Sequence, residues 1–283
     1  MISNTRRSFL RQGLMTAMGL GVFPSCTVSH RNAWPPAVAG IGVITNTIKK
    51  ELAEDCLGTL QRVRQLGYGF LETAGTRDPK RVRRADIMAA DLRTPIGGLS
   101  IGHLQKDFPA IIESAQKYGY QYITTYWPWL TAANQLNEKE VKETAGRLNR
   151  IGRALKEAEL GFTWHNHDKV FAEIGKGTAF DLLMEETDPA YVNLQLDTYW
   201  AAKAGQDPVK IMQAHPGRVP LLHLKDMNLK GEYDCVGAGK LDTAAILTNR
   251  DIAGTKYTVV EIDNTEDEIA CITASMTTIR RLL

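Results

Sequence analysis

Four apolar runs in the second half of the chain each end in a side chain that can bind a metal ion. The runs are Gly161–His165, Tyr191–Asp197, Val219–Asp226 and Tyr257–Asp263. Each has about the length of one buried strand. The ionisable residues at or near their ends are His165 with His167, Asp197, His223 and Glu261. Because parallel strands bring their carboxyl ends to one side of a sheet, these distant groups are expected to converge.

Imidazole and carboxylate groups together form a mixed nitrogen and oxygen ligand set that suits Mn, Mg, Co or Zn. We therefore predict a divalent metal bound by His165, Asp197, His223 and Glu261. For any one of these residues, a polar side chain where a strand simply ends is the commoner explanation. Four consecutive runs that end this way weaken that explanation, although the chain has no short ligand motif of the HExxH kind.

Other polar and aromatic residues lie near the same strand ends. His165 and His167 have the same parity along a strand, so one can bind the metal while the other contacts substrate or supports a ligand. Glu72 ends an earlier strand-like run and is a candidate for contacts with substrate hydroxyls. Trp127 and Trp200 are candidates for stacking on a sugar ring, with core packing or a lid as the alternative for Trp127.

Strand-like and helix-like runs alternate throughout the chain from residue 38 to residue 283. The four earlier strand-like runs are Val38–Thr45, Phe70–Thr73, Ile96–Ile101 and Tyr120–Trp127. The expected helices are Glu51–Leu66, Pro79–Leu92, Lys106–Tyr118, Asn137–Glu159, Ala179–Glu186, Pro208–Ala214, Thr243–Ile252 and Glu266–Leu282. Strict alternation over about 250 residues predicts a single-domain (β/α)8 TIM barrel. A doubly wound open sheet is the alternative, but no GxGxxG follows the first strand.

The N-terminus has the features of an export signal. Twin arginines, Arg6 and Arg7, precede a short apolar region, which is typical of the twin-arginine route across the bacterial inner membrane. We therefore expect residues 1–25 to be a cleavable signal and residues 26–37 a linker, with the protein in the periplasm. The apolar region is too short for a transmembrane anchor. Cys26 lies where a lipoprotein cysteine would be, so a lipid anchor is a further possibility.

Charge and cysteine content argue against several other classes of protein. The formal charge is +2; removing Arg6, Arg7 and Arg11 with the signal gives 2 − 3 = −1, which favours no nucleic-acid partner. The cysteines form neither a disulfide framework nor a CxxC zinc motif. Cys56 and Cys271 are interpreted as small apolar residues within helices.

Longer motifs resemble one known family. They are Trp164–Asp168 (WHNHD), Leu196–Thr198 with Ala204–Pro208, Pro216–Asp226, Val236–Asp242 and Val260–Asp263. Their identities and order resemble the sugar phosphate isomerase/epimerase family, whose xylose isomerase-like TIM barrel is shared with endonuclease IV. The resemblance spans about residues 40–283 and is strongest from Asn149 onward.

The resemblance implies a metal held at the ends of strands five to eight, with Asp197, His223 and Glu261 at three matching positions. Many members have Glu on strand five, whereas this chain has His165, as in an HNH-type branch. Members with two glutamates move a proton on opposite faces of an enediolate. Of that pair only Glu261 remains, so His165, His167 or Lys225 must supply the second group. Lys225 could also donate to the substrate oxygen; an ion pair with Asp226 or a position in a solvated loop is the alternative.

These observations predict an exported, metal-dependent isomerase or epimerase that acts on a sugar, polyol or keto-sugar through an enediolate. Its predicted catalytic residues are Glu261, His167 and Lys225. A lyase or dehydratase of the inosose or 3-keto-glycoside type is the first alternative, and a non-catalytic carbohydrate-binding protein is the second. Gly237 and Gly239 could cradle a phosphate or could be turn glycines. A homo-oligomer remains open.

Overall fold

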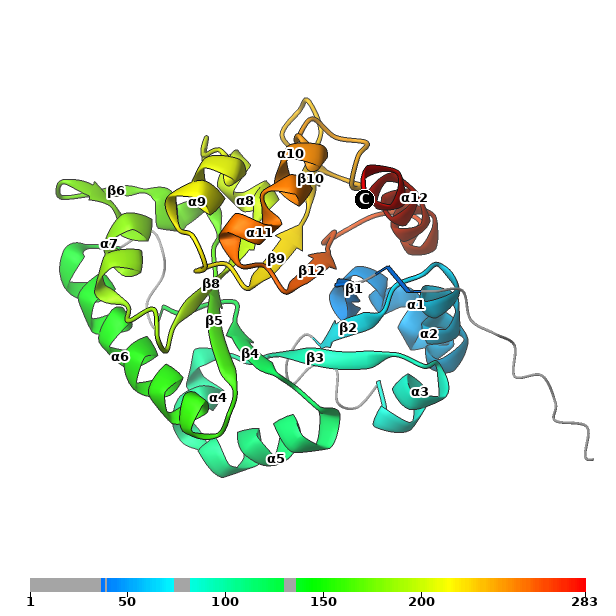
Figure 1. Cartoon of the computed structure of the whole chain (residues 1–283), viewed down its shortest axis with the longest axis horizontal. Coiled ribbons are helices and arrows are strands. Elements are labelled where there is room, and N and C mark those ends of the chain that lie inside the picture. The colour runs from blue at the N-terminus through cyan, green and yellow to red at the C-terminus, as the bar shows by residue number, and fades with distance from the viewer. Residues whose placement is uncertain (1–36, 39, 74–81, 130–135) are drawn as a thin grey trace, which may run out of the picture. The chain divides into compact units, whose positions relative to one another are not determined.

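Eight parallel strands form a closed barrel in the computed structural model, which describes residues 37–38, 40–73, 82–129 and 136–283. The strands are β1 (Ile41–Ile44), β2 (Phe70–Thr73), β3 (Arg93–Gly98), β4 (Tyr122–Thr125), β5 (Gly161–His165), β8 (Asn193–Asp197), β9 (Leu221–Leu224) and β12 (Tyr257–Val260). They pair in the order β1-β12-β9-β8-β5-β4-β3-β2, and β1 pairs with β2 to close the ring (Figure 1). The predicted TIM barrel is confirmed.

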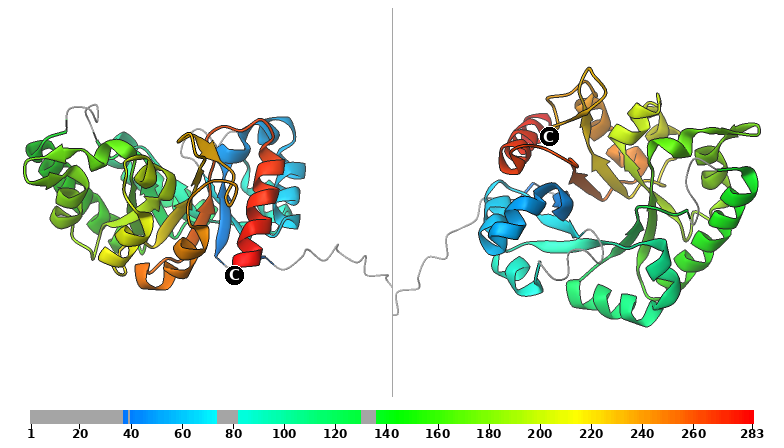
Figure 2. Two further views of the ribbon diagram at one scale, coloured as in Figure 1. Left: turned by 90° about the horizontal axis from the view of Figure 1, so that it is seen from above. Right: turned by 180° about the vertical axis from the view of Figure 1, so that it is seen from behind.

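Helices surround this barrel, as the views in Figure 2 show. They are α1 (Lys49–Glu54), α2 (Cys56–Gln65), α3 (Arg84–Ala89), α4 (Ile101–Lys106), α5 (Phe108–Tyr118), α6 (Glu138–Glu157), α7 (Ala179–Glu186), α8 (Thr198–Lys203), α9 (Pro208–Ala214), α10 (Thr243–Thr248), α11 (Arg250–Ala253) and α12 (Glu268–Leu282). The longest, α6, begins at the predicted cap, since the Asn137 side chain accepts from the Glu140 amide. Its apolar face, including Val141, Leu148 and Leu155, is fully buried. The main core lies between helices and strands.

The third strand differs from its prediction, which placed it at Ile96–Ile101. It runs instead from Arg93 to Gly98, and Ile101 begins α4. Two consecutive glycines lie inside the strand because tyrosine rings pack directly on them. A Cβ at Gly97 would lie 2.4 Å from the Tyr120 ring, and one at Gly98 would lie 2.2 Å from the Tyr126 ring. A pair of glycines in a sequence usually indicates a turn, but here both glycines lie within a strand and allow close packing of the tyrosine rings.

Several helical regions also differ from expectation. The single helix predicted at Glu51–Leu66 is divided, because the Asp55 side chain accepts from the Gly58 amide and begins α2 there. The short helix α8 follows β8 without a loop and was not predicted. Its N-cap is Asp197, whose carboxylate oxygen Oδ1 accepts from the Trp200 amide at 2.8 Å. The predicted helix Pro79–Leu92 is shorter, at Arg84–Ala89, and its first residues lie outside the described ranges.

The segment after β9 is held in two ways. It contains a small hairpin, β10 (Asp226–Met227) with β11 (Tyr233–Asp234), and a disulfide joins Cys235 to Cys271 on α12. The Cα atoms of the two cysteines are 5.4 Å apart. The interpretation of Cys271 as an apolar residue was therefore wrong. Thirty-six residues separate the two cysteines, and only the barrel brings this segment beside α12.

The carboxylate of Asp226 organises the same segment from inside. Its two oxygens accept from the backbone amides of Met227, Gly237, Gly239 and Leu241 at 2.7 to 3.2 Å. Asp226 is only 2% exposed. A Cβ at Gly239 would lie 2.3 Å from Asp226 Oδ1, so glycine allows this close approach. The two glycines thus serve a turn built around an internal carboxylate.

The predicted export signal, the lipid anchor at Cys26 and all but the last residue of the linker lie outside the described residues and remain predictions. Within the described part of the chain, none of the helices has the length and apolar character needed to span a membrane.

Candidate metal centre

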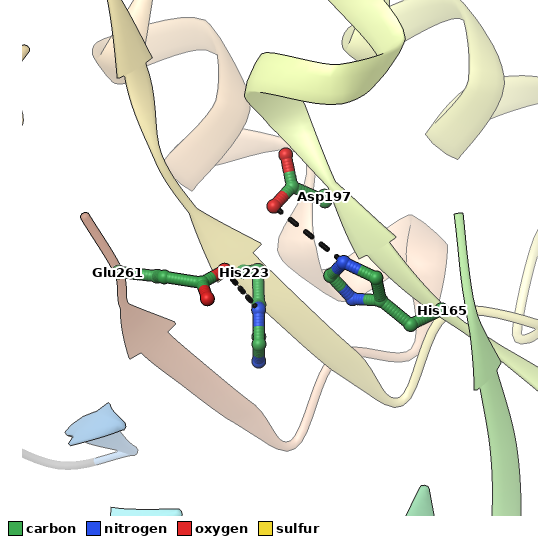
Figure 3. Close-up of side chains that lie close together, drawn as sticks. All are labelled: His165, Asp197, His223 and Glu261. Atoms are coloured by element: carbon green, nitrogen blue, oxygen red, sulfur yellow. Dashed lines mark hydrogen bonds and ion pairs between the residues drawn. The ribbon is translucent and has the colours of Figure 1, made fainter. Parts of the chain in front are cut away.

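His165, Asp197, His223 and Glu261 converge inside the carboxyl end of the barrel, although 96 residues separate the first from the last. Each of the four side chains offers one ligand atom, and these atoms all lie within 4.8 Å of one another. Figure 3 shows the four side chains, hereafter the four-residue cluster, pointing toward one another from β5, β8, β9 and the end of β12. The predicted convergence is confirmed.

Strand register accounts for this convergence. Asp197 on β8 is opposite His223 on β9, and His165 on β5 is opposite Gln195. Alternate residues along each strand face opposite sides, so Trp164 and Leu224 pack in the outer core while their histidine neighbours face inward. The same parity places His167 beside His165, with ring centroids 4.9 Å apart.

The four-residue cluster fits a divalent cation in charge and size. The Asp197 side chain is fully buried, and its Oδ2 atom has no hydrogen-bond partner among the described residues. Two nitrogens near this oxygen, His165 Nε2 at 3.8 Å and Lys225 Nζ at 3.9 Å, lie beyond hydrogen-bond distance, so a bound cation would compensate a buried charge that is costly otherwise. The four ligand atoms lie within 4.8 Å of one another, and imidazole nitrogen and carboxylate oxygen are donors that a zinc-sized ion accepts. Burial raises the pKa of Asp197 to about 7 in the metal-free chain.

His223 lies between two carboxylates. Its Nδ1 atom is 2.7 Å from Glu261 Oε2, and its Nε2 atom is 3.0 Å from Glu72 Oε2. Burial alone would lower the pKa of His223, but the two carboxylates raise it well above the usual histidine value. For Glu261 the effects are reversed: burial would raise its pKa, but the positive charges of Lys225 and His223 hold that pKa well below its usual range. The positive charge of Lys225 and a raised pKa at His223 thus offset the buried acids.

Lys225 brings a second positive charge to the centre. Its side chain is 1% exposed, and Nζ lies 3.6 Å from Glu261, 3.9 Å from Asp197 and 2.5 Å from Asp263. Burial would lower the pKa of Lys225, but the three carboxylates outweigh burial and raise it. The sequence left open an ion pair between Lys225 and Asp226. Among the described residues Lys225 pairs with Asp263 instead, and Asp226 accepts from backbone amides.

Aromatic rings surround the polar groups of the centre. The rings of Tyr199, Trp200 and Tyr233 lie 4.7 to 5.5 Å from Lys225 Nζ. His167 lies between Trp127 and Trp200, at centroid distances of 5.7 and 5.3 Å. Trp127 is 39% exposed. Burial lowers the pKa of His167, so the ring is neutral at pH 7 and one nitrogen can accept a proton. Substrate contacts by both tryptophans remain a prediction.

Glu72, predicted to contact substrate, is fully buried and lies against His223. Its other partners are the Tyr126 hydroxyl, which donates to Oε1 at 2.6 Å, and the Gln195 amide, which donates to Oε2 at 2.9 Å. The structure thus brings Glu72 to the centre, and the contact with substrate stays a prediction.

Several supporting residues were not predicted. The Asn166 side chain accepts from the Asp197 amide and donates to the Asp197 carbonyl, which ties β5 to β8. The Thr198 hydroxyl accepts from the Lys225 amide and donates to the Lys225 carbonyl at 2.7 Å, which ties α8 to the end of β9. The sequence signals for Asn166 were its place in the WHNHD motif and its position between His165 and His167, whose side chains have the opposite parity.

Comparison with known proteins identifies partial relatives. No protein-family model matches the chain. A stretch of 94 residues is 34% identical to an inosose dehydratase of Clostridium tetani, and it covers 32% of this chain and 30% of that protein. The chain therefore matches less than a third of the length of this curated relative.

Similar solved structures cover nearly the whole barrel. A sugar phosphate isomerase/epimerase from Parabacteroides distasonis aligns with a TM-score of 0.71 and 24% identity, over 87% of this chain and 96% of that one. The IolI protein with a binding zinc atom aligns with a TM-score of 0.61 and 14% identity, over 86% and 96%. The structural neighbours are thus sugar phosphate isomerase/epimerase and xylose isomerase-like TIM barrels, which confirms the predicted resemblance.

Proposed function

We propose that this protein is a divalent-metal-dependent enzyme that removes a proton next to the carbonyl group of a sugar, a keto-sugar or an oxidised polyol. The four-residue cluster carries the proposal, above all Asp197, whose buried Oδ2 lacks a hydrogen-bond partner among the described residues. Mn, Mg, Co and Zn all suit this mixed donor set. The dehydratase relative supports this class of enzyme, and the structural neighbour with a bound zinc atom supports a metal ion at the barrel end.

A bound divalent ion would act as a Lewis acid toward the carbonyl oxygen of the substrate, where negative charge builds up. The chain supplies the remaining groups. Glu261, with its pKa held low, is an ionised carboxylate, and neutral His167 is 4.9 Å from His165 on the same side. Either group can accept the proton from carbon. Lys225 remains charged and favours negative charge on a nearby oxygen. Trp127 and Trp200 would orient the sugar ring of the substrate by stacking on it.

Two outcomes follow proton removal, and we favour elimination. The electron pair released from the C–H bond moves to the carbonyl oxygen, and its return expels the group on the β-carbon, which leaves with its bonding electrons and takes up a proton. Epimerisation instead returns a proton to the opposite face and needs a second base there. Glu261 is the one glutamate in the cluster, since His165 occupies the strand-five position. The inosose dehydratase relative also favours elimination.

Incubation of the protein with a 3-keto-glycoside, and separately with an inosose, tests this proposal. We expect about one divalent ion per chain by elemental analysis. We also expect the 3-keto-glycoside to release its aglycone and the inosose to be dehydrated, and both reactions to stop with a chelator and return with added metal. A pure epimer without release would replace elimination by epimerisation. Sugar binding that survives chelation, without turnover of either substrate, would favour the non-catalytic alternative.

The disulfide supports the predicted export, since structural disulfides persist mainly in oxidising compartments. In protein recovered from the periplasm of a bacterial host, we expect peptide mapping to show Cys235 linked to Cys271. A variant with Arg6→Lys and Arg7→Lys should stay in the cytoplasm with both thiols free. Wild-type protein found only in the cytoplasmic fraction would contradict export by the twin-arginine route.

A further inference from the structure

We propose that Glu72 is a positioning residue that fixes the His223 ring, so that Nε2 carries a proton and Nδ1 is the atom that binds the metal. This inference depends on the proposed metal centre. It concerns a residue outside the four-residue cluster, on β2, across the barrel from β9. It also gives Glu72 a role different from the substrate contact that its place at a strand end predicted.

The His223 ring faces a carboxylate at each nitrogen. Nδ1 lies 2.7 Å from Oε2 of Glu261, a member of the four-residue cluster, so this side of the ring faces the metal position. Nε2 lies 3.0 Å from Glu72 Oε2 and points away from Glu261, as Figure 3 shows. A neutral histidine binds a metal through one nitrogen while the other keeps its proton, and the hydrogen-bond acceptor opposite the protonated nitrogen fixes this tautomer.

Neighbouring donors leave Glu72 fully committed as an acceptor. The Tyr126 hydroxyl donates to Oε1, and the Gln195 amide donates to Oε2. The orientation of that amide follows from Thr124, whose hydroxyl donates to Gln195 Oε1 at 3.0 Å. The Gln195 nitrogen must therefore face Glu72. Glu72 Oε2, which lies opposite Nε2 of His223, is then a hydrogen-bond acceptor for both groups.

Burial and packing prevent this arrangement from relaxing. Glu72, Thr124, Gln195 and His223 are each 0% exposed, and they come from β2, β4, β8 and β9. The Tyr126 ring lies over Gly98, where any side chain would displace it. A charged acceptor held this rigidly also makes the imidazole a stronger ligand. The network therefore sets both the direction and the basicity of His223.

The test measures metal affinity and coordination in Glu72→Gln and Glu72→Leu. Affinity for Co²⁺ and Zn²⁺ is determined by chelator competition, and the visible spectrum of the Co²⁺ protein reports ligand identity and geometry. Outer ligand partners of this kind contribute about 10- to 100-fold in metal affinity. We expect a loss of about tenfold for Gln, which keeps an acceptor but no charge, and about 100-fold with an altered Co²⁺ spectrum for Leu.

Glu268→Gln is the matched control, because Glu268 is 3% exposed and accepts only backbone amides, those of Lys50 and Glu51, in the described structure. It should bind Co²⁺ as wild type does. If Glu72→Gln binds within twofold of wild type, the positioning role is wrong, even if Glu72→Leu fails to fold. If wild-type protein itself binds neither ion, the proposed function fails instead, which separates the two conclusions.

Discussion

Replacement of Glu261 by glutamine is expected to lower kcat by roughly 10³- to 10⁴-fold, the upper part of the range for loss of a general base. Glu261 lies at the end of β12, 8% exposed, and Lys225 and His223 hold its pKa well below the usual range. Glutamine preserves the shape but cannot accept a proton from carbon, and it is a poor metal ligand. Steady-state kinetics at saturating metal measures the effect.

Metal content must be measured on the same Glu261→Gln sample, because loss of the ion alone would also abolish turnover. The matched control is Glu157→Gln, since Glu157 is an exposed glutamate at the end of α6. That variant should keep wild-type kinetics. A Glu261→Gln protein with full metal content and more than a tenth of the wild-type kcat would exclude Glu261 as the base.

Replacement of Lys225 by methionine is expected to destabilise the metal-free protein by about 3–5 kcal/mol, the cost of removing one partner from a buried ion pair. The substitution keeps an unbranched apolar stem beside Tyr199, Trp200 and Tyr233 but leaves three carboxylates without their shared cation. Added metal should restore part of this loss, because it compensates Asp197 and Glu261 directly. Urea denaturation with chelator and with metal measures both effects.

Lys203→Met is the control for Lys225→Met. Lys203 lies over the same Tyr199 ring, at 5.5 Å, but is exposed to solvent. Its loss should cost under about 1 kcal/mol, as is usual for an exposed cation. Equal stability of Lys225→Met and wild type in the presence of chelator would show that Lys225 does not compensate the buried acids.

The sequence predicted those parts of the fold that local pattern determines. Apolar runs of strand length alternated with amphipathic segments, so the barrel and the convergence of His165 with Glu261 followed from the periodicity and the direction of the strands. Parity also predicted that His165 and His167 share a side. These predictions needed only the spacing of residues within one element and the rule that parallel strands end together.

Features that depend on contacts across the barrel were not predicted. Glu72 meets His223 only because β2 and β9 face each other across the interior, which no spacing within either strand reveals. The Cys235–Cys271 bond required the segment after β9 to lie beside α12. The strand position of Gly97 depended on one particular ring, that of Tyr120. Tertiary packing decided each of these positions.

The internal carboxylate of Asp226 has a consequence for the kind of ligand that the barrel can accept. In many TIM barrels, free amides in the loops after strands seven and eight bind a phosphoryl group. Here the amides of Gly237, Gly239 and Leu241 already donate to Asp226, so this loop presents a filled anion site. A phosphorylated ligand would gain no hydrogen bonds from these amides and would meet a like charge. We therefore expect this loop to favour uncharged ligands over phosphate esters.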